Sequence, residues 1–140
     1  MELKELASIS GKGGLFRVVK PGKTGMILES LDEAKTRLVA NPNMKMSLLD
    51  EISIYTRTKE GTTPLADVLR KIHKEFPGDL GVGGDSDPAE LRAFLKSVLP
   101  DFDEDRVYPS DIKKLVKWFE IIRRTAPEVL ADATVSKKES

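Results

Sequence analysis

The sequence predicts an α+β protein in which an SH3-like small β-barrel, residues 1–60, precedes a three-helix unit, residues 61–127. Short runs rich in β-branched and aromatic residues, separated by turn residues, fill the first part of the chain. After Gly61 the apolar residues recur at helical spacing, with start and stop signals around them. Four or five short strands cannot bury both faces as an open sheet, so we expect the sheet to close into a barrel.

The first part contains four expected strands. They cover residues 15–20, 26–30, 36–40 and 52–56. Pro21 and Gly22 take the second and third positions of a type II turn between the first two strands, which should therefore form a hairpin. We expect residues 47–50 to form one helical turn, with Ser47 as its cap, before the last strand.

The second part contains three expected helices. The first follows the cap residue Thr63 and has Pro64 as its first residue. The second begins at Asp87, with Glu90 three residues later, a spacing typical of a capping box. The third begins near Asp111, an acid that suits the positive end of the helix dipole, and ends at two arginines.

The composition excludes several classes of chemistry. The chain has 140 residues, a single His and no Cys, so it has no disulfide, thiol nucleophile or iron–sulfur ligand and few ligands for a transition metal. We expect no metal and no cofactor. No apolar run approaches the roughly 18–20 residues that span a bilayer, so we expect a cytoplasmic protein without a membrane partner. Residues 128–140 have few large apolar side chains and should form a disordered tail.

Two segments look like ligand-binding motifs and fail the requirements of those motifs. Residues 21–24 end like a phosphate-binding P-loop, but Arg17 stands where the motif needs a glycine, and a strand follows instead of a helix. Residues 101–105 begin like a calcium loop, but Arg106 and Ile112 replace the required Gly and Glu. We interpret the first as a hairpin turn and the second as a solvated acidic connection in which Arg106 can pair with a neighbouring acid.

The acidic connection also contains apolar residues. Phe102, Val107 and Tyr108 are threaded through the acids. We expect all three to be buried beneath the second and third helices and to hold these helices at a fixed angle.

A basic stretch provides the first candidate binding surface. No acid occurs between Glu5 and Glu29, and the cations of this stretch are Lys12, Arg17, Lys20 and Lys23. On a barrel rim these residues would form a patch that contacts RNA or another polyanion through counterion release. The competing interpretation is a plain solvated surface, because the formal net charge of the chain is zero.

The third predicted helix provides the second candidate surface. Its residues are Lys113, Lys117, Trp118, Ile121 and Arg124. Apolar anchors among polar groups are typical of protein–protein hot spots, so a protein-interaction adaptor is the alternative function. Trp118 lies at the border of the apolar stripe and could equally belong to the core. No nucleophile, base and oxyanion arrangement can be named, so we expect a non-enzymatic binding module without catalytic residues.

The chain also resembles a known family in six segments. These are residues 3–5 with 9–15, 49–56, 90–94, 98–108, 110–115 and 117–119. The segments are similar to a family of short uncharacterised bacterial proteins, a domain of unknown function typical of Bacteroidetes. This resemblance implies a cytoplasmic bacterial protein with a small β domain and a helical C-terminal domain, and it implies no activity and no site residues.

Overall fold

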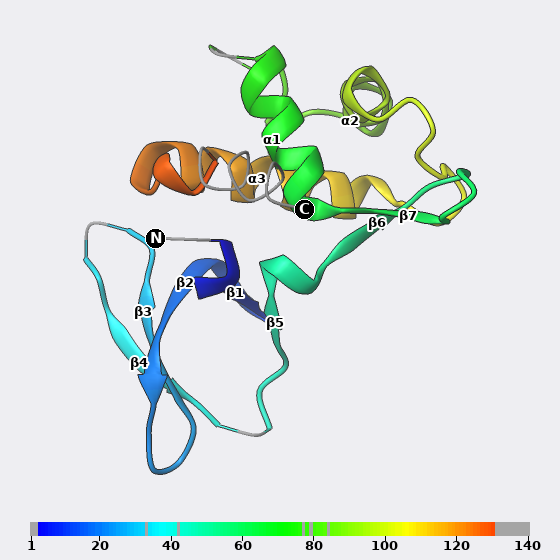
Figure 1. Ribbon diagram of the computed structural model, residues 1–140. Helices are drawn as coiled ribbons and strands as arrows, with labels where there is room; N and C mark the ends of the chain where they lie inside the picture. Colours follow the sequence, from blue (N-terminus) through cyan, green and yellow to red (C-terminus); the bar gives the residue numbers. More distant parts are fainter. Residues whose placement is uncertain are drawn as a thin grey trace.

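A computed structural model describes residues 3–32, 34–41, 43–76, 78, 80–83 and 85–130, without the side chains of residues 12 and 13. Its strands are β1 (Leu6–Ile9), β2 (Lys12–Pro21), β3 (Met26–Ser30), β4 (Arg37–Ala40), β5 (Met46–Leu48), β6 (Ser53–Tyr55) and β7 (Thr62–Pro64). Its helices are α1 (Leu65–Glu75), α2 (Pro88–Val98) and α3 (Pro109–Thr125), with short 3-10 helices η1 (Leu3–Glu5) and η2 (Leu49–Glu51). Figure 1 shows the three α-helices grouped on one side of the larger sheet.

The larger sheet has five antiparallel strands in the order β4-β3-β2-β1-β5. The chain passes through four neighbouring strands in succession, and β5 then returns to pair with β1. The two edge strands, β4 and β5, do not pair with each other in the described part of the chain. The α+β class is therefore confirmed, whereas closure of the sheet into an SH3-like barrel is not.

The predicted hairpin between β2 and β3 is confirmed, but its turn lies further along the chain. Pro21 is the last residue of β2, and the backbone N–H of Gly22 donates to the carbonyl of Gly25 at 2.7 Å. Gly22 does not adopt the positive φ that a type II turn requires at its third position. A Cβ at Gly25 would overlap the backbone carbonyl oxygen of Ala40, so this position requires glycine.

Strand pairing accounts for two local predictions that are wrong. Ser47 belongs to β5, which pairs with β1, and the single helical turn begins only at Leu49. Thr63 belongs to β7, which pairs with β6, so it does not cap the first helix. The structure begins α1 at Leu65, with no side-chain hydrogen bond at its cap.

The other two helices begin close to their predicted positions. At α2, the Asp87 carboxylate accepts from the Glu90 N–H at 2.9 Å, and the Glu90 carboxylate accepts from the Asp87 N–H at 3.0 Å. The predicted capping box is therefore confirmed. At α3, the Asp111 carboxylate accepts from the Tyr108 N–H at 3.0 Å. No helix in the described residues has the length and apolar composition needed to cross a membrane.

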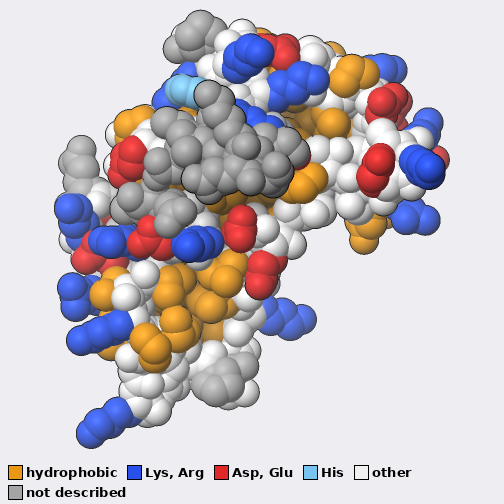
Figure 2. Space-filling model, in the orientation of Figure 1, with side chains coloured by type: hydrophobic (Ala, Val, Ile, Leu, Met, Phe, Trp, Pro, Cys, Tyr) orange, Lys and Arg blue, Asp and Glu red, His pale blue; other side chains and the backbone are white. Residues whose placement is uncertain are grey.

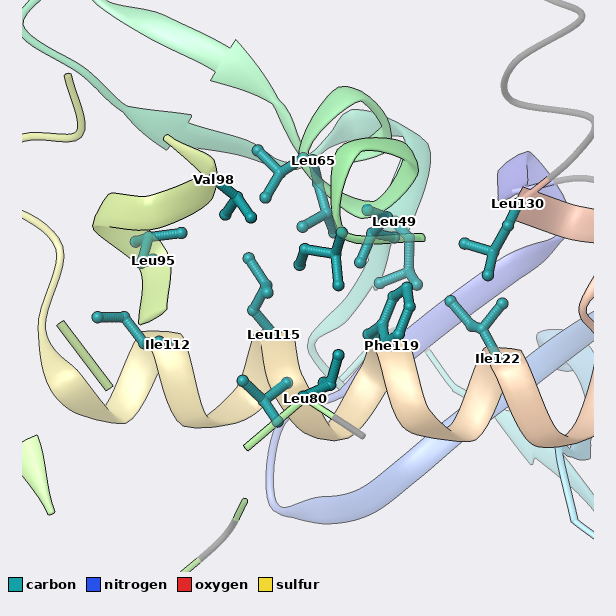
Figure 3. Close-up of a cluster of buried hydrophobic side chains, with 14 of the residues drawn as sticks. Leu49, Leu65, Leu80, Leu95, Val98, Ile112, Leu115, Phe119, Ile122 and Leu130 are labelled. Carbon is teal, nitrogen blue, oxygen red and sulfur yellow. The ribbon is translucent and has the colours of Figure 1, made fainter. Parts of the chain in front are cut away.

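A large buried cluster joins the helices to one face of the five-stranded sheet. Leu6, Leu15 and Leu49 from the N-terminal part belong to the same cluster as the apolar stripes of α1, α2 and α3. In Figure 3, Leu49 of η2 lies next to Phe119 of α3, which is fully buried, and Leu95 and Val98 of α2 lie towards Ile112 and Leu115 of α3. Residues of the two predicted parts, 1–60 and 61–127, thus share one cluster.

The segment predicted to be a tail has two buried side chains at its start. Val129 and Leu130 belong to the large cluster, each with 1% of its surface exposed. Residues 131–140, the rest of the predicted tail, lie outside the described residues.

A smaller cluster lies on the opposite face of the sheet. Its buried members are Ile9, Phe16, Leu28 and Ala40. Because neighbouring strand residues point to opposite faces, Leu15 enters the large cluster while Phe16 enters the small one. Partly buried side chains surround it, among them three methionines, Met26, Met44 and Met46.

The acidic connection between α2 and α3 is anchored to the end of β6. The Arg57 N–H donates to the Asp101 carbonyl at 2.7 Å, and the Asp103 N–H donates to the Tyr55 carbonyl at 2.9 Å. Phe102 and Val107 are buried, as predicted. The prediction for Tyr108 is wrong: 62% of this residue is exposed, because it stands at the cap position before α3, outside the stripe that packs on the core.

Candidate functional site

The four predicted polyanion-binding residues do not form a single patch. Lys12 is the first residue of β2, next to the turn that joins β1 and β2, and its side chain is not described. Lys20 lies near the other end of β2, and Lys23 lies in the β2–β3 turn; both are exposed. A strand rises roughly 3.3 Å per residue, so Lys12 and Lys20 are separated by about 25 Å along β2.

Arg17, in the middle of β2, is surrounded by acids that the sheet brings to it. Its guanidinium lies 3.7 Å from the Glu5 carboxylate. Glu29 is its cross-strand neighbour on β3, and Glu29 also pairs with Arg37 of β4 at 3.6 Å. The two acids that border the acid-free stretch in the sequence thus flank its central cation in the fold. In Figure 2, Lys and Arg side chains lie along the margins of the sheet region, and apolar side chains dominate the face between them.

The five residues predicted on the third helix are divided between surface and core. Lys117 and Arg124 are exposed, and Lys113 is partly exposed. Trp118 and Ile121 are partly buried and pack against the large cluster. The two predicted apolar anchors are thus partly exposed at the edge of the large cluster.

A groove of about 450 Å³ lies between the β1–β2 turn, β5 and α3. We call it the junction groove. It is lined by three lysines, three serines, two glycines, two isoleucines and one tryptophan: Lys45, Lys114, Lys117, Ser8, Ser10, Ser47, Gly11, Gly14, Ile9, Ile52 and Trp118. Among these described lining residues there is no acidic side chain.

Local structure explains how the sheet contributes to the junction groove. Gly11 and Gly14 have φ values of 86° and 78°, which allow the tight connection between β1 and β2. The Ser10 N–H donates to the Lys45 carbonyl at 2.9 Å and ties this connection to the residue before β5. Ser8 and Ser47 are direct cross-strand partners, so their hydroxyl groups lie side by side on the face that carries Leu6.

The helix contributes a single face to the same groove. Lys117 and Trp118 follow Lys114 by three and four residues, so both lie next to Lys114 on the surface of α3. Within the described chain, neither of these lysines forms an ion pair, and neither does Lys45. The groove therefore combines three uncompensated positive charges with hydroxyl donors and one aromatic ring.

A second groove of about 240 Å³ continues from the first. The two grooves share Ile52, Lys114 and Trp118. The second groove extends to Tyr55, whose ring centroid lies 5.4 Å from the Arg106 guanidinium carbon. Its one acidic lining residue in the described chain is Asp111, whose carboxylate is engaged by the Tyr108 N–H.

The acidic connection has a different character, because its charges are paired. Asp103 lies 3.6 Å from Arg57 and 3.8 Å from Arg106, and Asp105 lies 3.2 Å from Arg57. The predicted pairing of Arg106 with a neighbouring acid is confirmed. No group of three or more His, Asp or Glu side chains in the described residues is placed to hold a metal ion.

A larger hollow of about 720 Å³ lies along α1, next to the exposed His73. Three cations, Arg70, Lys71 and Lys74, and two acids, Asp67 and Glu75, line it, and Arg70 pairs with Asp67 at 2.9 Å. Because acids stand among its cations, this hollow attracts anions less than the junction groove does, so the junction groove is the better candidate site.

Sequence reasoning identified only part of the junction groove. It singled out Lys117 and Trp118, although for a different partner, and it placed Lys12 in the connection that forms one wall. It noted Lys114 beside these residues without assigning it to a site, and it missed Lys45 and the three serines. Their only signal in the sequence is that they are polar residues near strand ends, which is true of many residues outside any site.

Comparisons with known proteins place the chain in a family. Residues 3–49 match the model of a domain of unknown function, DUF5606, and residues 52–122 match that of a second one, DUF6852. A solution NMR structure of a Bacteroides vulgatus protein, determined by the Northeast Structural Genomics Consortium, is 35% identical with a TM-score of 0.72. The match covers 89% of this chain and 88% of that one. No curated protein matches. The chain therefore belongs to an uncharacterised Bacteroidetes-type family built from these two domains of unknown function, as the resemblance in its sequence predicted.

Proposed function

We propose that this chain is a cytoplasmic, non-enzymatic binding module that contacts RNA or another polyanion through the junction groove. One observation carries the proposal. Lys45, Lys114 and Lys117 converge on one groove from two separate elements, and no described acid lines that groove with them. A cluster of cations of this kind attracts phosphates even when the net charge of the chain is zero.

The expected salt dependence follows from the number of cations. If the three lysines each neutralise one phosphate of a single strand, the logarithm of the affinity should fall with a slope of about −2 against the logarithm of salt concentration. Raising the salt from about 50 mM to about 200 mM should then weaken binding about 20-fold.

The rim formed by Lys12, Arg17, Lys20 and Lys23 is the competing surface for the same function. It is less favoured because Arg17 is flanked by Glu5 and Glu29 and because Lys20 and Lys23 lie far from Lys12 along β2. Lys12 is compatible with both surfaces, because its backbone lies next to the wall of the junction groove.

The test compares two double variants that carry the same change of charge. Lys45→Glu with Lys117→Glu alters the junction groove, and Lys20→Glu with Lys23→Glu alters the far end of β2. Binding of a fluorescein-labelled single-stranded RNA is measured by anisotropy at low and high salt, and circular dichroism checks the fold of each variant. We expect the first variant to lose binding and the second to retain it.

The other outcomes are decisive as well. Loss of binding only in the Lys20 and Lys23 variant would show that the polyanion binds at the rim and not in the junction groove. If the unaltered protein binds neither RNA nor polyphosphate at low salt, polyanion binding is wrong and the adaptor becomes the better proposal. The adaptor would use Trp118 and Ile121, and Ile121→Asp should then abolish its partner contact while the fold is retained.

We also retain a partly opened SH3-like barrel as the finer description of the sheet. The meander of β1 to β4 and the return of β5 to β1 support it. An experimental structure in which β4 and β5 remain far apart would reject this description and leave the proposed groove unchanged.

A further inference from the structure

On the basis of the proposed function, we infer that the ligand is a single-stranded nucleic acid whose bases stack on Trp118 and, further along the surface, on Tyr55. The proposed function requires only phosphates. Base stacking additionally requires the aromatic side chains that lie among the cations.

Trp118 occupies the point where the two grooves meet. It lines both of them, is partly exposed and is the only tryptophan of the chain. Two lysines of α3 line the junction groove with it, Lys114 one turn before it and Lys117 immediately before it. An indole ring beside cations is a suitable partner for a nucleobase, because the base stacks on the ring while the lysines neutralise the phosphates on either side.

Tyr55 provides a second aromatic surface in the continuation of the groove. It is 48% exposed, and the Arg106 guanidinium lies over its ring. Arg106 is held from the other side by Asp103, at 3.8 Å. A planar guanidinium on an aromatic ring extends the area on which a base can stack. The cations thus continue along both grooves, from Lys45 through Lys114 to Arg106.

Stacking on Trp118 and Tyr55 favours a single strand over a duplex. In a duplex the bases are stacked on one another and present only their edges, so they cannot cover Trp118 or Tyr55. A single strand can turn its bases outward and place them on aromatic side chains. Because every base has a flat aromatic face, we expect little preference for sequence.

The single tryptophan provides a direct test on the unaltered protein. Its fluorescence is recorded during titration with a short oligouridylate, with an RNA duplex and with inorganic polyphosphate of matched charge. We expect quenching by the oligouridylate and none by polyphosphate, together with weaker binding of the duplex. Equal affinity for all three without quenching would overturn the inference and leave polyanion binding intact, whereas no binding of any of them would reject the proposed function itself.

Variants test each aromatic side chain separately. Trp118→Leu keeps an apolar side chain against the core but removes the aromatic face, and Trp118→Phe restores a face. We expect about a tenfold loss of oligouridylate affinity for the first and a smaller loss for the second, with polyphosphate affinity unchanged in both. Unchanged oligouridylate affinity in Trp118→Leu would contradict stacking at this position.

The second platform has a matched control. Tyr55→Leu should weaken oligouridylate binding several-fold. Tyr108→Leu alters a tyrosine that is even more exposed, at 62%, but lines neither groove, and it should have no effect. Equal effects of the two substitutions would remove Tyr55 from the site.

Discussion

The two faces of the five-stranded sheet are covered in different ways. One face carries Leu6 and Leu15, which belong to the large cluster together with residues of α1, α2 and α3. The other face carries the small cluster, whose four buried residues all come from the sheet strands themselves. The first face therefore ties the sheet to the helices, and the second stabilises the sheet alone.

This difference also explains where the candidate site lies. The junction groove forms at the border of the face that packs on the helices, where Ser8 and Ser47 of the sheet meet Trp118 of α3. Two parts of the chain must be held together for such a groove to exist. In the described part of the chain, no helix residue belongs to the small cluster. We therefore expect substitutions in the large cluster to affect both stability and binding, and those in the small cluster to affect mainly stability.

The largest effect should come from Phe119→Ala. This ring is fully buried where η2, α1 and α3 converge, so its removal leaves a cavity that neighbouring elements cannot fill. We expect the free energy of unfolding to fall by about 3–5 kcal/mol. Chemical denaturation followed by circular dichroism measures it, with the exposed Glu120→Ala on the same helix as control. A loss similar to that of the control would show that the large cluster is not the main source of stability.

A smaller effect is expected from Leu28→Ala in the small cluster. Leu28 is fully buried, but its neighbours Met26, Met44 and Met46 are only partly buried and can move into the vacated space. We expect a loss of about 2–3 kcal/mol, at the lower end of the range for such substitutions. If Leu28→Ala lowers the free energy of unfolding by more than Phe119→Ala does in the same experiment, the large cluster does not contribute more to stability than the small one.

Gly25→Ala tests the close approach of two backbone segments, at Gly25 and at Ala40, beside the small cluster. The added Cβ would overlap the Ala40 carbonyl, so β3 and β4 must separate at this point. We expect destabilisation by about 1–2 kcal/mol, within the range for overpacking. Gly78→Ala is a suitable control, because a Cβ there meets no atom within 4 Å. Equal melting temperatures of Gly25→Ala and Gly78→Ala would contradict the close approach of Gly25 to Ala40.

The smallest effect concerns pH and the turn between β3 and β4. Hydrogen bonds from the Ser30 hydroxyl at 2.9 Å and from the Lys35 N–H at 3.0 Å lower the pKa of the exposed Asp32 below its ordinary value of 3.8. A lowered pKa in the folded state adds stability above the unfolded pKa, and this stability is lost as the pH falls through the folded pKa.

Asp32→Asn should therefore lower the melting temperature slightly at neutral pH. The difference from the unaltered protein should shrink as the pH falls below about 4, where the unfolded state becomes protonated first, and it should vanish once the pH lies below the lowered pKa of the folded state. A difference that grows on acidification would contradict the assigned direction of the pKa shift.

Local chemistry determined the elements that the sequence predicted correctly. The capping box of Asp87 and Glu90 and the hairpin around residues 21–25 depend on residues close together in the chain. Ser47 and Thr63 were assigned wrongly because strand pairing, with the distant β1 for Ser47 and with the preceding β6 for Thr63, outweighed their preference for helix caps. Tyr108 was assigned wrongly because an apolar residue in a connection can be buried or exposed, and only the packing of its neighbours decides which.

The sequence by itself determined the α+β class, most of the strands and helices, the family and two residues of the candidate groove, Lys117 and Trp118. Tertiary structure decided how the parts meet. It placed Glu5 and Glu29 beside Arg17, left the sheet open in its described part, and brought Lys45 and the serines to the same groove as α3. The physical reason is that charge compensation and groove formation depend on distances between residues far apart in the chain. Strand register and core packing set those distances, and neither can be obtained from local propensities.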